Sequence, residues 1–252
     1  MKKDERQAKI KDYVQQQGYV SFRQLKNRFP DYSEMTLRND LQTLHDKHFI
    51  VRIHGGATAL PSDLRSDDLF FQHANRKISQ KQLIARKAAQ LVRPNDSIFI
   101  DNGTTATELA KVFPDESVSI VTTSISCAME LARLRKPSVY LLGGDVNRYN
   151  LGVHSPKNQA ILEQMNFNLM FMAVAGYSKE TGFTCGTEVE DIVRKTAMSR
   201  SGKVVALMDS GKVGTIFTVT YATQDDVDVV ISDDELDPET REDLLAHGVQ
   251  IL

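Results

Sequence analysis

The stretch SEMTLRNDLQTLHDKHFIVRIHGGA, residues 33–57, decides the fold of the first part of the chain. It opens with Ser33, a residue type that caps helices, and leucines follow at positions 37, 41 and 44, the spacing of one buried helix face. The segment FIVRIHGGA then alternates apolar residues with Arg52 and His54, which is the period of a β-strand. The sequence therefore predicts a capped amphipathic helix followed by a short β-ribbon.

Two further short helices are predicted before this stretch. Residues 4–17 carry a mostly apolar stripe at i, i+3, i+4, i+7, and Gly18 stands where a helix commonly stops. Ser21 can cap a second helix, FRQLKNRF, which Pro30 ends. Three short helices and a β-ribbon predict a winged helix-turn-helix domain over residues 1–57.

The polar residues at the start of the third helix suit the reading of DNA. A helix in the major groove presents its N-terminal residues to base edges, and its dipole favours nearby phosphates. Arg38 can form two hydrogen bonds with guanine, Asn39 can pair with adenine or hold a phosphate, and Thr36 can contact a thymine methyl group or a phosphate. We expect Asp40 to orient Arg38 or to cap a neighbouring element, because DNA repels a free carboxylate. The alternative is that Arg38 and Asn39 only solvate a surface helix.

The ribbon completes the predicted DNA-binding surface. Its charged residues and the Gly55-Gly56 turn suit a wing that lies along the DNA backbone or in the minor groove. We therefore predict double-stranded operator DNA as a partner. The predicted contact residues are Ser33, Thr36, Arg38, Asn39, Arg52, His54 and Gly55.

Composition and charge agree with a two-part soluble protein. Residues 1–57 hold 11 Lys and Arg against 7 Asp and Glu, a net charge of +4, whereas the remainder carries −6. No run of 18 or more apolar residues exists and no apolar signal segment follows the first lysines, so we expect no membrane contact. Cys127 and Cys185 lack metal-like spacing, so we expect a reducing cytoplasm and neither a metal nor a cofactor.

From residue 81 the pattern changes to alternating helices and buried strands. Apolar runs separated by helical patterns predict an α/β fold with a mostly parallel sheet that is covered on both faces. We read residues 58–80 as a connector and residues 81–252 as the second domain. The predicted strands are SIFID, VSIVTT, SVYLLGG, NLMFMAVAG, KVVALMD, DVVIS and VQIL.

The run IFIDNGTTATELA predicts an anion site where a strand becomes a helix. Gly103 lets backbone amides approach an anion, and Thr104 and Thr105 add hydroxyl donors at a helix N-terminus. The alternative is that these residues only cap the helix. Taken alone, the motif therefore leaves both interpretations open.

Other loops follow neighbouring strands, and ligands of open α/β sheets bind beyond the carboxyl ends of the strands. Arg148 or Lys212 would suit a phosphate, and Asp101 and Glu190 would suit sugar hydroxyls. Lys212 taken alone could instead be a solvated loop lysine. The predicted effector contacts are Asp101, Gly103, Thr104, Thr105, Thr123, Ser124, Gly143, Gly144, Arg148, Gly176, Glu190 and Lys212.

Both halves of the chain resemble the DeoR family of bacterial transcriptional repressors. RQAKIKDYVQQQGYVSFRQL, TLRNDLQTL and RIHGGA are similar to its DNA-binding head. FIDNGTT, LLGG, EDIVRKTA and MDSGKVG match its sensor domain in order and spacing. The chain departs from the family at Leu37 and Asn39, where isoleucine and a second arginine are usual, and at Ser124, which follows threonine without the usual asparagine.

The resemblance implies a repressor with a phosphorylated-sugar effector site in a fold similar to ribose 5-phosphate isomerase. An operator with two half-sites implies a homo-oligomer, either a dimer or a tetramer. One alternative is a sugar-phosphate isomerase with an accessory DNA-binding head. Another is a constitutive DNA-binding protein whose second domain only drives oligomerisation.

Overall fold

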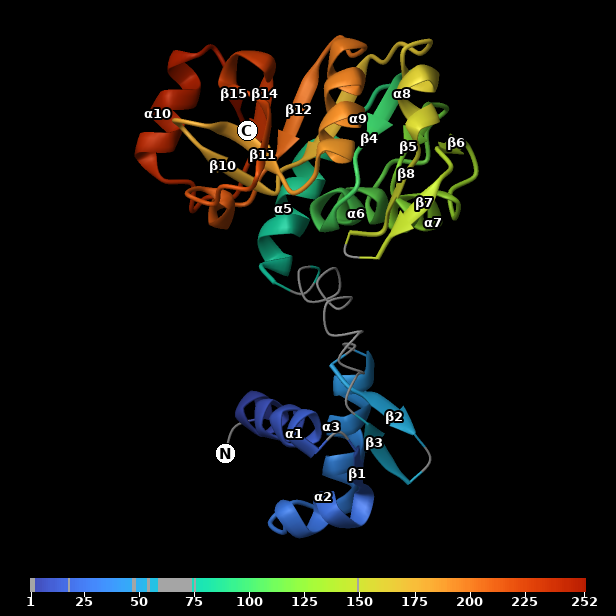
Figure 1. Ribbon diagram of the computed structural model, residues 1–252, viewed down its shortest axis with the longest axis vertical. Coiled ribbons are helices and arrows are strands. Elements are labelled where there is room, and N and C mark those ends of the chain that lie inside the picture. The colour runs from blue at the N-terminus through green and yellow to red at the C-terminus, as the bar shows by residue number, and fades with distance from the viewer. Residues whose placement is uncertain are drawn as a thin grey trace. The chain divides into compact units, whose positions relative to one another are not determined.

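The computed structural model describes two compact units, Met1–Arg76 and Lys77–Leu252 (Figure 1). We call them the head and the sensor unit. The described residues are 3–17, 19–46, 49–53, 55–58, 74, 76–148 and 150–252. The predicted helix stop at Gly18 and most of the predicted connector lie outside them. No described helix is both long enough and apolar enough to span a bilayer.

The head is a winged helix-turn-helix, which confirms the first part of the predicted fold. Its helices are α1 (Lys3–Gln17), α2 (Phe22–Arg28) and α3 (Glu34–Asp46). Its strands, β1 (Tyr19–Ser21), β2 (Val51–Ile53) and β3 (Gly56–Thr58), form an antiparallel sheet in the order β1-β3-β2. The leucine stripe of α3 packs into one core with Ile10 and Val14 of α1.

The predicted ribbon is therefore a hairpin of two strands, β2 and β3, joined at a tight turn. Gly55 in this turn has a φ of +82°, a conformation that glycine adopts without strain. The pairing of β3 with β1 was not predicted, because a three-residue strand is too short to show a period of two.

The sensor unit contains a seven-stranded, wholly parallel sheet in the order β15-β14-β12-β9-β4-β5-β6, which confirms the predicted α/β fold. All seven predicted strands are present. They are β4 (Ser97–Ile100), β5 (Ser119–Thr122), β6 (Ser138–Leu141), β9 (Leu169–Ala173), β12 (Val204–Leu207), β14 (Val229–Ile231) and β15 (Gln250–Ile251).

Helices cover both faces of this sheet, as predicted. One core contains residues of α5 (Ile78–Ala89), α6 (Thr104–Lys111) and α7 (Ile125–Leu131), and the other contains residues of α8 (Pro156–Leu162), α9 (Glu188–Ser199) and α10 (Pro238–Ala246). Alternate residues of each strand face the two cores: Ile98 and Ile100 lie in the first, whereas Phe99 lies in the second.

Two segments that the sequence presented as loops contain regular structure. The first forms a hairpin of β7 (Asp145–Asn147) and β8 (Gly152–His154). The second contributes β10 (Gly176–Ser178) and β11 (Gly182–Cys185), which form a small antiparallel sheet with β13 (Val219–Ala222) and then lead into α9. Short 3-10 turns, η1 (Ser210–Lys212) and η2 (Gln224–Asp226), complete the unit.

Candidate nucleic-acid interface and effector site

Helix α3 begins with a side-chain cap that uses two of the predicted DNA contacts. The Ser33 hydroxyl accepts a hydrogen bond from the Thr36 backbone N–H at 3.1 Å, and the two hydroxyls lie 2.9 Å apart. The cap satisfies one of the free N–H groups of the first turn. Both hydroxyls are thus engaged within the helix, while still lying at the end that would meet DNA.

Arg38 and Asn39 are exposed on α3, as the predicted base-reading residues must be. The Arg38 guanidinium lies 4.3 Å from the centroid of the Phe22 ring. One of its nitrogens is 3.7 Å from a carboxylate oxygen of Glu34, one helical turn earlier. Arg38 is therefore held at the surface by an aromatic ring and an acid.

Asp40 does not orient Arg38, so that expectation is wrong. Its side chain is buried and binds α1, accepting hydrogen bonds from Arg6 at 2.5 Å and from Gln7 at 2.9 Å. This hydrogen bond to Asp40 raises the pKa of Arg6 above its ordinary value. A buried carboxylate needs such partners, and here they fasten α3 to α1.

The wing is attached to the start of α2. The Phe22 backbone N–H donates to the Gly55 carbonyl oxygen at 2.8 Å. A Cβ on Gly56 would lie 2.3 Å from the Val20 carbonyl oxygen, so the close approach of β3 to β1 requires glycine there. Arg52 lies in β2, but its side chain and all of His54 fall outside the described part of the structure.

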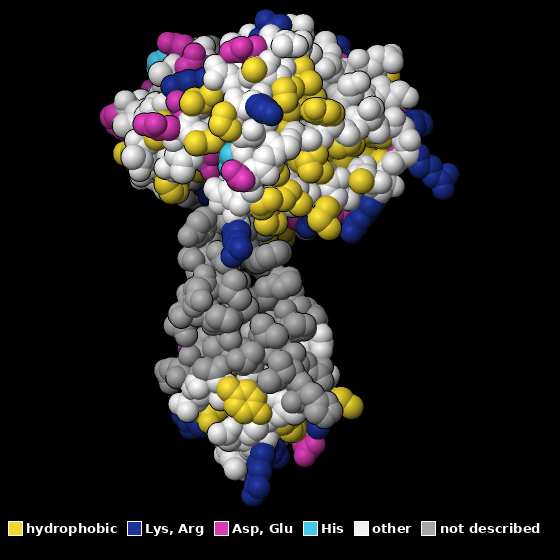
Figure 2. Space-filling model, turned by 45° about the vertical axis from the view of Figure 1, so that its right-hand side comes forward, with side chains coloured by type: hydrophobic (Ala, Val, Ile, Leu, Met, Phe, Trp, Pro, Cys, Tyr) yellow, Lys and Arg dark blue, Asp and Glu magenta, His cyan; other side chains and the backbone are white. Residues whose placement is uncertain are grey.

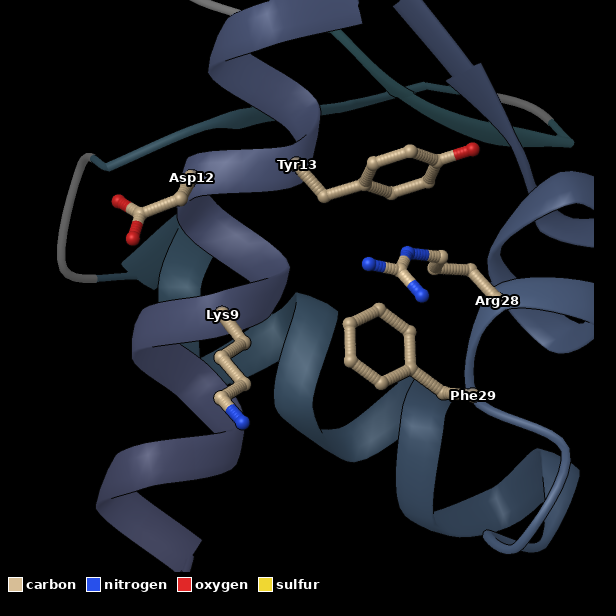
Figure 3. Close-up of a pocket in the computed structure, with 5 residues that line it drawn as sticks. All are labelled: Lys9, Asp12, Tyr13, Arg28 and Phe29. Atoms are coloured by element: carbon tan, nitrogen blue, oxygen red, sulfur yellow. The ribbon is translucent and has the colours of Figure 1, made fainter.

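A small hollow of about 270 Å³ lies between α1 and the end of α2 (Figure 3). Lys9, Asp12 and Tyr13 line it from α1, and Arg28 and Phe29 line it from the other side. Figure 3 shows the Arg28 side chain lying between the rings of Tyr13 and Phe29, whose centroids are 6.4 Å apart. None of the described side chains of α3 lines this hollow, so we assign it no part in base reading.

In the sensor unit, the order of the strands reverses between β4 and β9. From β4 the chain continues to β5 and β6 on one side, whereas from β9 it continues to β12, β14 and β15 on the other. In open α/β sheets, ligands bind in the crevice outside the carboxyl ends of the strands at such a point. Asp101 follows β4 directly at this position.

Helix α6 begins at the same place. Gly103, its N-cap, has a φ of +141°, and a Cβ there would lie 2.8 Å from the Cβ of Ala173 at the end of β9. Glycine is therefore required both by its conformation and by the close approach. Thr105 is buried and Thr104 is half-buried at the N-terminus of the helix, where the dipole favours an anion.

Four side chains, three of them buried, form a network beside Asp101. The Arg194 Nε donates to Asp101 at 2.8 Å, and another Arg194 nitrogen lies 3.4 Å from Glu190. The other carboxylate oxygen of Glu190 accepts a hydrogen bond from Asn150. The Arg194 guanidinium also lies 4.9 Å from the centroid of the Tyr221 ring. The two acids predicted to bind sugar hydroxyls thus share one arginine.

Burial and neighbouring charges together shift the pKa values of Asp101 and Arg194 in this network. Burial raises the pKa of Asp101, and the charge of Arg194 opposes this rise. Burial lowers the pKa of Arg194, but Asp101, Tyr221 and Glu190 outweigh it and hold the pKa above its ordinary value. Arg194 therefore remains a cation within reach of both acids.

The β7–β8 hairpin closes over the ends of β4 and β5. Val153 in β8 donates its backbone N–H to Thr123 at 2.7 Å, and Gly152 donates to the Asn150 side chain at 2.9 Å. A Cβ on Gly152 would lie 2.6 Å from the Asn102 amide nitrogen, so Asn102 and Asn150 both pack against this glycine. The hairpin thus brings the Asn150 amide to the Asp101 cluster, next to Asn102, which follows Asp101 in the chain.

The Ser124 side chain caps a helix. Its buried hydroxyl accepts from the Cys127 backbone N–H at 3.2 Å and lies 3.0 Å from the Ser126 hydroxyl. It is the N-cap of α7. Thr123 beside it is also buried and faces the hairpin through its backbone.

The remaining predicted contacts are three glycines and the cations Arg148 and Lys212. Gly143 and Gly144 are both exposed, but Gly144 has a φ of +144°, and a Cβ there would lie 2.1 Å from the His154 carbonyl oxygen. Arg148 is exposed in the turn of the hairpin, and Lys212 is half-buried in η1. A Cβ on Gly176 would lie 2.3 Å from the Thr215 carbonyl oxygen.

The groups gathered here can bind a ligand. A helix N-terminus, an arginine, two acids and two amides can receive an anionic, hydroxyl-rich molecule. Among the described residues, no group of three or more His, Cys, Asp or Glu is placed to hold a metal ion. Burial raises the pKa of the Cys127 thiol to about 12, which makes it unreactive.

Sequence reasoning missed Asn102, Asn150, Arg194, His154 and Tyr221. Arg194 had a usable signal, because it follows Glu190 by four residues and thus lies on the same face of a helix. Asn102 follows Asp101 directly in the FIDNGTT motif, and that position was its signal. Asn150 and Tyr221 gave no local signal, since only the folded hairpin and the small sheet bring them to the network.

Both units match known protein-family models. The profile of the DeoR-like helix-turn-helix domain matches residues 6–63, and that of the DeoR C terminal sensor domain matches residues 76–234. The chain is 32% identical to the HTH-type transcriptional regulator GolR of Listeria innocua over 92% of this chain and 91% of that protein. It is 30% identical to the lactose phosphotransferase system repressor of Streptococcus mutans over 85% of each.

Among solved structures, the chain is similar to ribose 5-phosphate isomerase A of Methanocaldococcus jannaschii. The match has a TM-score of 0.40 and 15% identity, and it covers 54% of each chain.

Proposed function

The chain belongs to the DeoR family of helix-turn-helix transcriptional regulators, and from this premise we propose that it represses a carbohydrate-use operon under the control of a phosphorylated sugar. The head binds operator DNA, and the sensor unit holds the effector. The name of the Streptococcus mutans relative, a repressor of a lactose phosphotransferase system, supports the repressor role and the link to carbohydrate use. A regulator of this kind acts in the cytoplasm.

One observation carries the effector proposal: the start of α6 and the Arg194 network lie together at the point where the strand order reverses. Gly103 and Thr104 offer a phosphate the positive end of a helix. Asp101 and Glu190, held by Arg194, offer acceptors to sugar hydroxyls. A sugar phosphate needs both kinds of group within one small site.

A thermal-shift screen tests this proposal. We expect one or more pentose or hexose phosphates to raise the unfolding temperature of the full chain, with the matching unphosphorylated sugar as the control. A duplex selected by the chain from a randomised library then serves in a gel-shift assay, where an effective sugar phosphate should weaken binding. If no member of a broad panel stabilises the chain or alters the gel shift, effector control is refuted.

Catalysis is the less favoured alternative. A sugar-phosphate isomerase needs a carboxylate or lysine free to move a proton. Here Asp101 and Glu190 are both bound by Arg194, and the closely matching relatives are transcriptional regulators. Turnover of any phosphate in the same panel would favour the enzyme instead.

A constitutive DNA-binding protein is the other alternative. It predicts operator binding in the gel shift and no thermal stabilisation by any sugar phosphate.

We also propose that the chain forms a homo-oligomer. Figure 2 shows hydrophobic side chains gathered over one face of the sensor unit. In the edge strand β6, Tyr140 is 52% exposed and Leu141 is 40% exposed. An apolar edge strand is a ready surface for pairing with a second chain. Light scattering should show a dimer or tetramer that Leu141→Lys weakens, and a monomeric native chain would contradict this.

A further inference from the structure

Arg38 and Phe22 lie on different helices and meet at the DNA-binding surface of the head. Phe22 is the first residue of α2, whereas Arg38 lies in the second turn of α3. The guanidinium carbon is 4.3 Å from the ring centroid, which is the geometry of a cation stacked on an aromatic face. We propose that Phe22 is a positioning residue for base reading and that it fixes the side chain of Arg38 before DNA arrives.

The position of the Phe22 ring is itself fixed. Ser21 forms a reciprocal cap with Gln24: its hydroxyl accepts from the Gln24 backbone N–H, and its own N–H donates to the Gln24 side chain at 2.8 Å. The ring also packs against the buried core of the head. The Phe22 ring is therefore fixed in place and can restrict the rotamers of the long Arg38 side chain.

Stacking leaves Arg38 able to read a base. A guanidinium that stacks on a ring uses its flat face, whereas two-point bonding to guanine uses the N–H groups at its edge. Glu34 can engage that edge, since its carboxylate lies 3.7 Å from an Arg38 nitrogen. A guanine can take the place of Glu34, but it need not displace the ring. Phe22 thus acts in the free and the bound head alike.

Phe22 also joins the recognition helix to the wing. Its backbone N–H donates to Gly55 at the wing turn, while its ring carries Arg38. One residue therefore fixes the spacing between the side chain that would read the major groove and the ribbon that would lie beside it. This inference rests on the proposed operator binding and names a specificity-determining residue for it.

A double-mutant cycle in the full chain tests the proposal. The probes are the selected duplex, copies with each G·C pair changed in turn, and an unrelated duplex. We expect Phe22→Leu to reduce the preference for the selected duplex by about 3- to 30-fold, at the same base pair that Arg38→Lys affects. Combining the two changes should cost little more than Arg38→Lys alone, because both remove one interaction.

Three controls keep the test decisive. Phe22→Tyr retains an aromatic face and should keep the preference of the native chain. Tyr19→Leu makes the same kind of change at a 48% exposed ring of the same head and should also leave the preference intact. Thermal unfolding shows whether Phe22→Leu remains folded, and Phe22→Met replaces it if it does not.

The outcomes separate this inference from the function on which it rests. Additive losses from Phe22→Leu and Arg38→Lys, or an equal loss on selected and unrelated duplexes, would overturn the positioning role while leaving operator binding intact. A native chain that selects no duplex from the library would instead refute the proposed function.

Discussion

Asn39 is the exposed residue of α3 at which this chain departs from the usual family pattern, and it follows Arg38 directly. Asparagine pairs with adenine, whereas arginine pairs with guanine. We expect Asn39→Arg to shift the preferred base at one operator position, with a change of about 1–3 kcal/mol in discrimination. Selection from a randomised duplex library by each protein measures this shift.

The matched control for this prediction is Asn27→Arg, which adds the same charge at an exposed position of α2. It should change affinity through charge alone, with no change in the selected sequence. If Asn39→Arg selects the same sequence as the native chain, Asn39 does not read a base.

His154 at the end of β8 is a group whose titration should affect stability. Both of its ring nitrogens are buried, and no hydrogen-bond partner for them is present among the described residues. Burial lowers the pKa of His154, Glu190 and Asp101 oppose this, and Arg194 adds to it. As the pH falls below the ordinary histidine pKa, the unfolded chain binds a proton that the folded chain resists, so stability is lost.

We therefore expect the free energy of unfolding to fall less steeply from pH 7.5 to 5.5 in His154→Gln than in the native chain. The difference should be a fraction of the ~1.4 kcal/mol per pH unit that one full proton contributes, because solvent screens part of the ring. Urea unfolding at several pH values measures it.

His247 provides a control of opposite sign. The Asp243 carbonyl oxygen raises the pKa of this exposed ring, so its contribution is present at low pH and is lost as the pH rises. His247→Gln should therefore make the fall in stability at acidic pH steeper. Identical slopes in the native chain and His154→Gln would show that His154 titrates normally.

At the scale of elements, the β7–β8 hairpin depends on one of two adjacent glycines. Gly144 has a φ of +144°, and a Cβ there would lie 2.1 Å from a carbonyl oxygen of β8, whereas a Cβ on Gly143 would meet no atom within 4 Å. We expect Gly144→Ala to destabilise the sensor unit by at least the ~1–3 kcal/mol of a strained backbone position. Gly143→Ala should cost under about 0.5 kcal/mol.

The same two alanine variants test the role of the β7–β8 hairpin in effector binding. Gly144→Ala disturbs the segment that carries Asn150 to Glu190, so it should also reduce thermal stabilisation by an effective sugar phosphate. Denaturant unfolding and the thermal-shift assay measure the two effects separately. Equal stability of the two alanine variants would mean that the hairpin relaxes easily and does not hold the site.

The elements that could be predicted from sequence are those whose pattern is local and long enough. The seven sheet strands are apolar runs such as NLMFMAVAG, and α3 carries both a cap and a leucine stripe. The β7 and β8 segments, DVN and GVH, are three residues each and too short to show a period. Their pairing depends on a turn and on contacts with residues at the end of β5.

The site could be predicted in part for the same reason. Strand-to-helix turns locate Asp101 and Gly103 because parallel strands end at one edge of a sheet. The partner of Asp101 is Arg194, 93 residues farther along the chain, and no local pattern connects them. Sequence reasoning thus located the acids but could not show that they are held as a pair by one arginine.

At the scale of the whole molecule, control of the operator requires a coupling free energy between two units that are each compact. Lys77, the first residue of the sensor unit, donates to the Ser210 hydroxyl at 2.9 Å and lies 4.0 Å from Asp209. Ser210 opens the η1 turn that also contains the predicted effector residue Lys212. The point where the chain enters the sensor unit is therefore bonded to a loop at the carboxyl edge of the sheet.

We expect the coupling to be reciprocal in the native chain: an effective sugar phosphate should weaken operator binding by the factor, roughly 5- to 150-fold, by which the operator weakens effector binding. Lys77→Met should reduce this factor while each ligand still binds alone, because the variant loses the contact with the η1 turn and keeps both proposed sites. Titrations of each ligand with and without the other measure all four affinities. Lys87→Met is the control, since Lys87 lies in α5, the helix that Lys77 precedes as N-cap, but donates to Ser232 instead. An unchanged factor in Lys77→Met, or an equal loss in both variants, would show that the signal leaves the sensor unit by another route.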